Sequence, residues 1–220
     1  MRTPYRIVAS ALGWFAIALY YSLVASTRSG PELVTWTVNF FSYFTIVGNI
    51  LVALAMGLPA LAPRSALGRW FARPSVRTVI AACIIVVGVV YYLLLSGRFT
   101  PQGWRLFSEI VLHYVTPTLF VLDWLIFVPK NELSWRVSLS GLVVPIIYLA
   151  WTFLHGAYSG FYPYYFINVT RLGYEQVLLT VAIMVAGFVC IMLALVGLGR
   201  LLSARSPAAR SADPAQLTQG

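Results

Sequence analysis

The chain has 220 residues, of which 60% are hydrophobic and only 10% are charged, and its formal net charge is +9. Its mean hydropathy is +0.83. Such a composition excludes an ordinary soluble domain, and at about 20 residues per crossing the chain holds about six membrane-spanning helices. We therefore predict an all-α, six-helix transmembrane domain over residues 1–202, with no room for a second domain.

The first apolar run, 7–25, follows Arg2 and Arg6. It is nearer a full span than the core of a signal peptide, and five further runs follow it, so we predict a retained first helix. Residues 26–36 contain Gly30-Pro31, a turn signal, and are predicted to form a loop. The second helix is predicted over 37–62.

A short basic loop is predicted next, with Arg64, Arg69, Arg73 and Arg77. The last four helices are predicted at about 78–96, 105–129, 137–154 and 174–202. Residues 203–220 are rich in Ala, Ser, Pro and Arg and too poor in large apolar groups to fold alone, which predicts a disordered cytoplasmic tail.

The distribution of basic residues predicts the orientation of the bundle. Six crossings place both termini on one side, which carries eleven lysines and arginines against four on the other. The positive-inside rule makes the richer side cytoplasmic, as in a bacterial plasma-membrane protein. A reporter fused to the C-terminus tests this. The net positive charge is thus explained by the membrane topology, and no soluble basic face with aromatic side chains for stacking exists. A nucleic-acid partner is therefore not expected.

Polar residues interrupt the fourth predicted helix. Glu109, His113, Thr116, Phe120 and Asp123 follow one another at spacings of three and four, and so share one helix face. A carboxylate or an imidazole in a spanning helix costs a few kcal/mol unless it faces protein or a water-filled cavity. This stripe is therefore predicted to face inward.

A second polar stripe, Ser42, Thr45 and Asn49, lies on the second predicted helix. Thr45 and His113 each stand about eight residues from the outer start of their predicted helices, or roughly 12 Å at 1.5 Å per residue. A hydroxyl and an imidazole are thus expected at one level. His155 is predicted at the outer end of the fifth helix.

This pattern points to nucleophilic catalysis, with Thr45 attacking a substrate and His113 taking its proton. Glu109, one turn away, would orient the imidazole. Asp123 is ten residues from His113, about 15 Å along a helix axis, and is too far to be its direct partner. The two cysteines, Cys83 and Cys190, have no metal-ligand spacing. No metal and no cofactor are expected.

Other interpretations of the same residues stay open. Serines and threonines in membrane helices often bond to backbone or to a neighbouring helix. A small transporter would use the stripes to bind a solute, although internal repeats are not evident. A non-catalytic membrane scaffold would need no chemistry. The tyrosines of FYPYYF, 161–166, fit an aromatic belt, or a substrate lid.

Three segments resemble the androgen-induced protein family, which includes the androgen-dependent tissue-factor-pathway-inhibitor regulator and bacterial six-pass relatives. They are YFTIVGN, LHYVTPTLFVLDW and YLAWTFLHGAYSGFYPYYF. In the resemblance Thr45 stands at the threonine nucleophile, His113 at the catalytic histidine and Asp123 at an acidic position. It implies a multipass threonine hydrolase that takes its substrate, a fatty-acid ester of a hydroxy fatty acid, from the lipid bilayer.

Overall fold

The computed structural model describes residues 2–98, 100–131 and 133–204. These residues form helices and loops, with no strand among them. Six helical segments are long and apolar enough to cross a membrane, which confirms the all-α, six-span prediction. Residues 205–220 of the predicted tail lie outside the described residues, whereas Ser203 and Ala204 end the last helix.

Three of the six spanning segments are single helices: α1 (Arg2–Ala25), α3 (Phe44–Leu61) and α10 (Val169–Ala204). The other three are made of consecutive elements. The first is α5 (Pro74–Val90) with the π-helical turn η1 (Tyr91–Leu95), the second is α6 (Gly103–Ile110) with the π-helical turn η2 (Val111–Val115) and α7 (Thr116–Phe127), and the third is α8 (Arg136–Ser140) with α9 (Val143–Ser159). Between them lie the short helices α2 (Gly30–Phe41) and α4 (Ala66–Ala72), and the 3-10 turn η3 (Tyr165–Ile167).

The predicted single helix over 37–62 is wrong. The chain breaks at Ser42 and at Tyr43, whose backbone is extended, and this break separates α2 from α3. The break is stabilised from both sides, because the Ser42 hydroxyl donates to the Val38 carbonyl and accepts a hydrogen bond from Trp151 of α9. The predicted loop at 26–36 is also mostly helical, since proline is well suited to the first turn that it occupies in α2.

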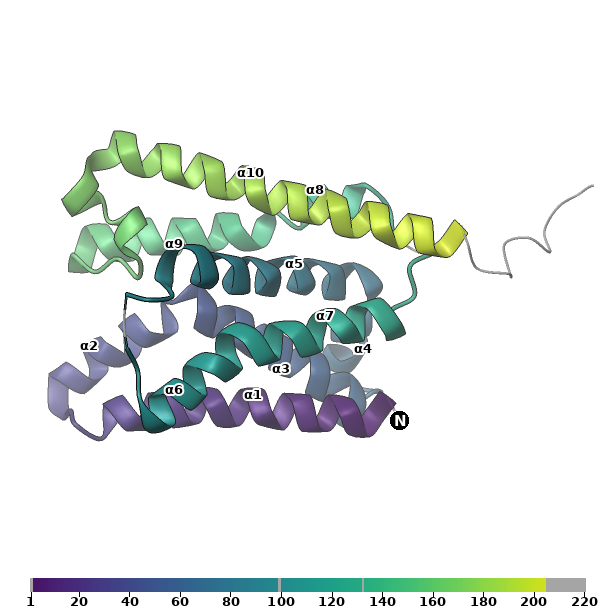
Figure 1. Ribbon diagram of the computed structural model, residues 1–220, viewed down its shortest axis with the longest axis horizontal. Helices are drawn as coiled ribbons and strands as arrows, with labels where there is room; N and C mark the ends of the chain where they lie inside the picture. The colour runs from purple at the N-terminus through teal and green to yellow at the C-terminus, as the bar shows by residue number, and fades with distance from the viewer. Residues whose placement is uncertain (1, 99, 132, 205–220) are drawn as a thin grey trace, which may run out of the picture.

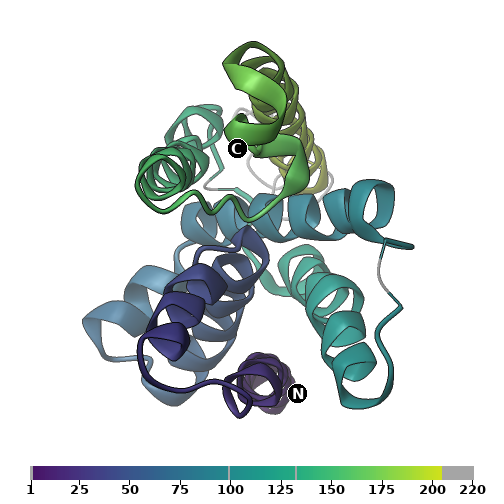
Figure 2. The same ribbon diagram turned by 90° about the vertical axis from the view of Figure 1, so that its left-hand side faces the viewer.

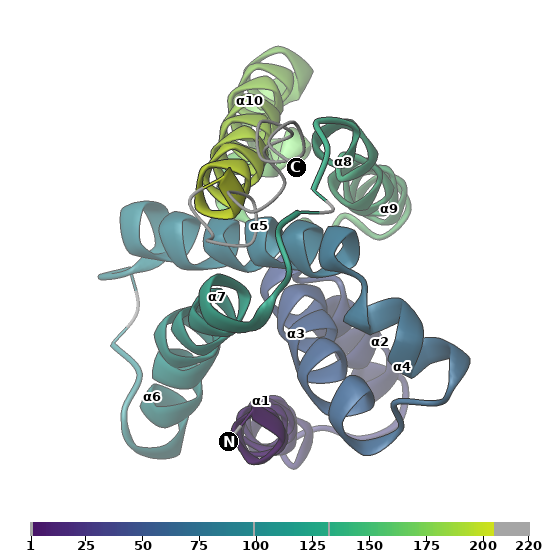
Figure 3. The ribbon, with the colours of Figure 1, turned by 90° about the vertical axis from the view of Figure 1, so that its right-hand side faces the viewer.

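The helices run side by side along the long axis of the bundle (Figure 1). The N-terminus and the far end of α10 lie at the same end, as an even number of crossings requires. Viewed along the bundle, α5 lies across the middle, with α1, α3 and α7 on one side and α9 and α10 on the other (Figures 2 and 3). Small and apolar side chains let α5 occupy this position, with Ala81, Ala82, Cys83 and Ile84 fully buried.

The predicted basic loop is shorter than expected. Helix α5 begins at Pro74, so Arg77 lies inside the helix and is buried. Arg6, counted with the N-terminal charges, is buried on α1. Lys130, also counted on that side, is buried as well. Without these three, eight of the eleven predicted cytoplasmic charges remain against four, and the orientation remains a prediction that rests on this excess.

Candidate functional site

Thr45 is the second residue of α3 and is buried. The first backbone N–H groups of a helix have no partner within the helix. The Thr45 N–H finds one outside it, the phenol oxygen of Tyr164, at 3.2 Å, and the Thr45 hydroxyl lies 3.3 Å from the same oxygen. The helix start and the Tyr164 side chain together hold the Thr45 hydroxyl in place.

Tyr164 was not singled out from the sequence, where it belongs to a tyrosine-rich loop. Its ring stacks on Phe166 with 5.2 Å between ring centres and packs edge-on against Tyr43. Burial raises the pKa of Tyr164 and that of Tyr43, the latter to about 12. Both phenols therefore keep their protons at neutral pH, and Tyr164 does not serve as a base for Thr45.

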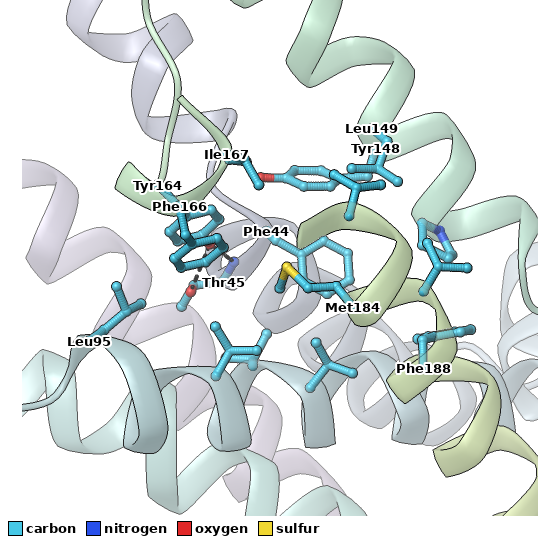
Figure 4. Close-up of a pocket in the computed structure, with 16 residues that line it drawn as sticks. Phe44, Thr45, Leu95, Tyr148, Leu149, Tyr164, Phe166, Ile167, Met184 and Phe188 are labelled. Carbon is cyan, nitrogen blue, oxygen red and sulfur yellow. Dashed lines mark hydrogen bonds between the residues drawn. The ribbon is translucent and has the colours of Figure 1, made fainter. Parts of the chain in front are cut away.

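A cavity of about 70 Å³ lies beside Thr45, between α3, α5, α9, α10 and the loop at 160–168 (Figure 4). Its wall is apolar except for the hydroxyls of Thr45, Tyr148 and Tyr164. The other lining residues are Phe44, Val86, Val87, Val90, Leu95, Pro145, Leu149, Phe166, Ile167, Val181, Met184, Val185 and Phe188. A wall of this kind suits the apolar part of a ligand rather than a polar group.

His113 lies in the π-helical turn η2 and is buried, as the inward stripe predicted. Its Nδ1 lies 3.0 Å from the Glu109 carbonyl oxygen and 3.1 Å from Glu109 Oε2. Both partners accept hydrogen bonds, so the proton of the neutral ring sits on Nδ1 and Nε2 is the basic nitrogen. Tyr91, in the other π-helical turn, stacks on this ring with 3.7 Å between ring centres.

Pro117 explains the irregular turn around His113. Proline has no N–H to donate to the carbonyl four residues back, and its ring clashes with that carbonyl in a regular helix. The helix widens instead, and the Thr116 N–H bonds to the Val111 carbonyl, five residues back. The freed His113 carbonyl faces α5 at Gly88, where a Cβ atom would lie only 3.3 Å away. Widened turns of this kind are frequent at functional sites.

Asn49 connects the two halves of the predicted pair. Its side-chain amide donates to the Thr45 carbonyl at 2.8 Å and to the Leu112 carbonyl, next to His113, at 3.0 Å. Within the described part of the chain, no hydrogen bond joins Thr45 to His113. The expected depth of Thr45, about eight residues inside its helix, is wrong, because Thr45 is the second residue of α3.

The remaining predicted residues lie outside this centre. Ser42 belongs to the break before α3 and not to the helix that carries Thr45 and Asn49. His155 Nε2 lies 2.9 Å from the side-chain oxygen of Asn39 on α2, and the imidazole stacks on Trp151. His155 therefore fastens α9 to α2.

Asp123 is fully buried and is bonded to two arginines. Arg6 Nε and Nη2 lie 2.6 and 2.8 Å from its two carboxylate oxygens, and Arg77 Nη2 bonds to Oδ2. The Arg77 guanidinium also donates to the Ala55 carbonyl and lies over the Phe120 ring. This group, which we call the Arg–Asp–Arg cluster, joins α1, α5 and α7 and is separate from Thr45 and His113.

No three His, Cys, Asp or Glu side chains in the described ranges gather in a way that could hold a metal ion. The arrangement offers instead a hydroxyl at a helix start, a cavity for hydrocarbon and an oriented imidazole. Comparison of the chain with models of protein families, with curated proteins and with solved structures finds no match.

Proposed function

We propose that this multipass membrane protein hydrolyses lipid esters, with Thr45 as the nucleophile and His113 as the general base. The observation that carries the proposal is the place of the Thr45 hydroxyl, which lies at the wall of a cavity that is apolar apart from three hydroxyls. An acyl chain in that cavity would bring its ester carbonyl to a hydroxyl rather than to hydrocarbon. The three segments that resemble the androgen-induced protein family favour the same two residues.

The role of His113 rests on its tautomer. With Nδ1 bonded to Glu109, Nε2 is left to accept a proton, as in other nucleophile–histidine–carboxylate sites. In the resting arrangement the Thr45 hydroxyl is engaged by Tyr164. Catalysis therefore requires Nε2 to reach that hydroxyl directly or through one water when substrate binds, a tightening that is common at catalytic sites.

The test is labelling of the purified protein by a fluorophosphonate probe, together with hydrolysis of p-nitrophenyl decanoate in detergent. Thr45→Ser keeps a nucleophilic oxygen and should keep measurable activity, whereas Thr45→Val keeps the shape and should lose at least about 10³-fold. Thr116→Val is the matched control, because Thr116 is a buried threonine that does not line the cavity.

The pair is tested by combining substitutions. His113→Ala should lower kcat by about 10²- to 10⁴-fold. Combined with Thr45→Val, His113→Ala should lower kcat little further, because the effects of residues that act as one catalytic unit are strongly non-additive. Wild-type activity in Thr45→Val, or fully additive losses in the double variant, would show that the two residues do not share a mechanism.

A further inference from the structure

Tyr148 of α9, which begins the third segment of the resemblance, lines the same cavity, and the proposed mechanism gives it no part. Its hydroxyl oxygen is buried and forms no hydrogen bond of normal length and angle with the residues that the structure describes. A buried hydroxyl without a partner destabilises the fold, so most are paired. One left unpaired at the wall of a cavity is a donor available to a ligand.

Tyr148 lies beside the candidate nucleophile. Its ring packs against Phe44, the residue before Thr45, with 4.8 Å between ring centres. Its hydroxyl points toward the end of the cavity where Tyr164 and Thr45 lie (Figure 4). Three hydroxyls, from α3, α9 and the loop at 160–168, thus gather on an otherwise apolar wall.

We propose that the Tyr148 hydroxyl is the oxyanion donor of the site, an inference that rests on the proposed function. Thr45 Oγ1 would bond to the ester carbonyl carbon as its proton passes to the base, and the π electrons of the carbonyl would move onto its oxygen. That oxygen accepts a hydrogen bond from Tyr148. When the carbonyl re-forms, the bond to the alcohol breaks and the alcohol takes the proton from the base. Water then cleaves the threonyl ester and releases the acid.

The division of roles between the two tyrosines follows from their partners. The Tyr164 hydroxyl is already engaged by the N–H and the hydroxyl of Thr45, so it is a positioning residue for the nucleophile. The Tyr148 hydroxyl is available to donate. In a site that excludes water, a donor aimed at developing negative charge stabilises the transition state more than it would in water.

The substitution that tests this is Tyr148→Phe, which removes one oxygen and keeps the ring. We expect kcat for p-nitrophenyl decanoate to fall by about 10²- to 10³-fold with KM changed less than about threefold, as for the loss of one oxyanion donor. The melting temperature in detergent should not fall, because the lost hydroxyl has no partner in the described structure.

Ser138→Ala is the matched control. Ser138 lies on α8 and its buried hydroxyl also has no partner within the described ranges, but it does not line the cavity. This variant should keep kcat within about twofold of wild type, because the lost hydroxyl lies away from the ester. Unchanged kcat in Tyr148→Phe, with wild-type hydrolysis intact, overturns the role of Tyr148 and leaves the proposed function standing.

Two further results would overturn the inference. A fall in kcat accompanied by a lower melting temperature, or an equal fall in Ser138→Ala, would assign Tyr148 a structural role. A wild-type protein that neither hydrolyses the ester nor reacts with the fluorophosphonate at Thr45 would overturn the proposed function together with this inference.

Discussion

The two sides of α5 are built in opposite ways. On the side of α1 and α7, the Arg–Asp–Arg cluster places three charged side chains in full burial and uses them to join three helices. On the side of α9 and α10, the helices leave an apolar cavity with three hydroxyls on its wall. One side is held together by directional bonds between charged groups, and the other combines apolar side chains with hydroxyls around a cavity.

The difference supports the cavity beside Thr45 as the ligand site of the proposed function. Buried ions hold one geometry, because moving any partner leaves an unpaired charge in a medium of low dielectric constant. Apolar side chains around a cavity shift at much smaller cost. We infer that the Arg–Asp–Arg side is the rigid frame against which the cavity side can adjust to an acyl chain.

Breaking the frame should have the largest effect. Asp123→Asn leaves Arg6 and Arg77 buried without an anion and should lower the free energy of unfolding by about 3–5 kcal/mol. Unfolding of the purified protein by sodium dodecyl sulfate in mixed micelles measures this. Glu32→Gln, at the exposed Arg28–Glu32 pair, is the control and should have little measurable effect. Equal losses in the two variants would contradict a special role for the buried cluster.

The sequence was sufficient to predict the six spans and the inward face of the polar stripe. Apolar runs of spanning length have few interpretations other than membrane-spanning helices. The free-energy cost of a charged or polar group in lipid determines that His113 and Asp123 face the protein interior. It was not sufficient to predict the partners of Asp123. Arg6 and Arg77 stand near the ends of apolar runs, where arginines usually reach toward the membrane surface.

The candidate site was predicted only in part, for two physical reasons. The break before α3 has neither glycine nor proline at 42–43 and depends on the bond from Trp151, which lies more than a hundred residues away. Tyr164 occurs in a loop whose tyrosines are typical of a membrane interface, and only the fold brings it to Thr45. Neither long-range contact has a local signal.

Removing the Tyr164 hydroxyl should have an intermediate effect, on the cavity side. Tyr164→Phe leaves the Thr45 N–H without its partner and should lower the free energy of unfolding by about 1–3 kcal/mol. It should also reduce kcat, because the Thr45 hydroxyl loses its neighbour. Tyr165→Phe is the matched control, because the Tyr165 hydroxyl makes only a long hydrogen bond, 3.5 Å, to the Leu94 carbonyl oxygen. A Tyr164→Phe variant as stable as that control would contradict the contact.

The same residue predicts a pH dependence. Burial raises the pKa of Tyr164, so above about pH 10 the unfolded chain loses this proton while the folded chain keeps it. Its contribution is complete below the unfolded pKa and is lost as pH rises through the folded pKa. Stability should therefore fall more steeply above about pH 10 in the wild type than in Tyr164→Phe. If the melting temperatures of the two proteins fell equally between about pH 9 and 11, the prediction would be contradicted.

Filling the cavity should have the smallest effect on stability, and in the opposite direction. Val185 of α10 lines the cavity, and Val185→Phe should raise the free energy of unfolding by about 0.5–2 kcal/mol if the ring occupies the space. It should also raise KM for p-nitrophenyl decanoate at least about tenfold and leave KM for p-nitrophenyl acetate, a second substrate with a short acyl chain, unchanged, because the acyl chain and not the carbonyl is displaced. Ile183→Phe, on the exposed face of the same helix, controls for the added ring and should change neither quantity. An equal rise in KM for both esters in Val185→Phe would mean that the ring disturbs Thr45 itself. Unchanged kinetics for both esters would show that the acyl chain binds elsewhere.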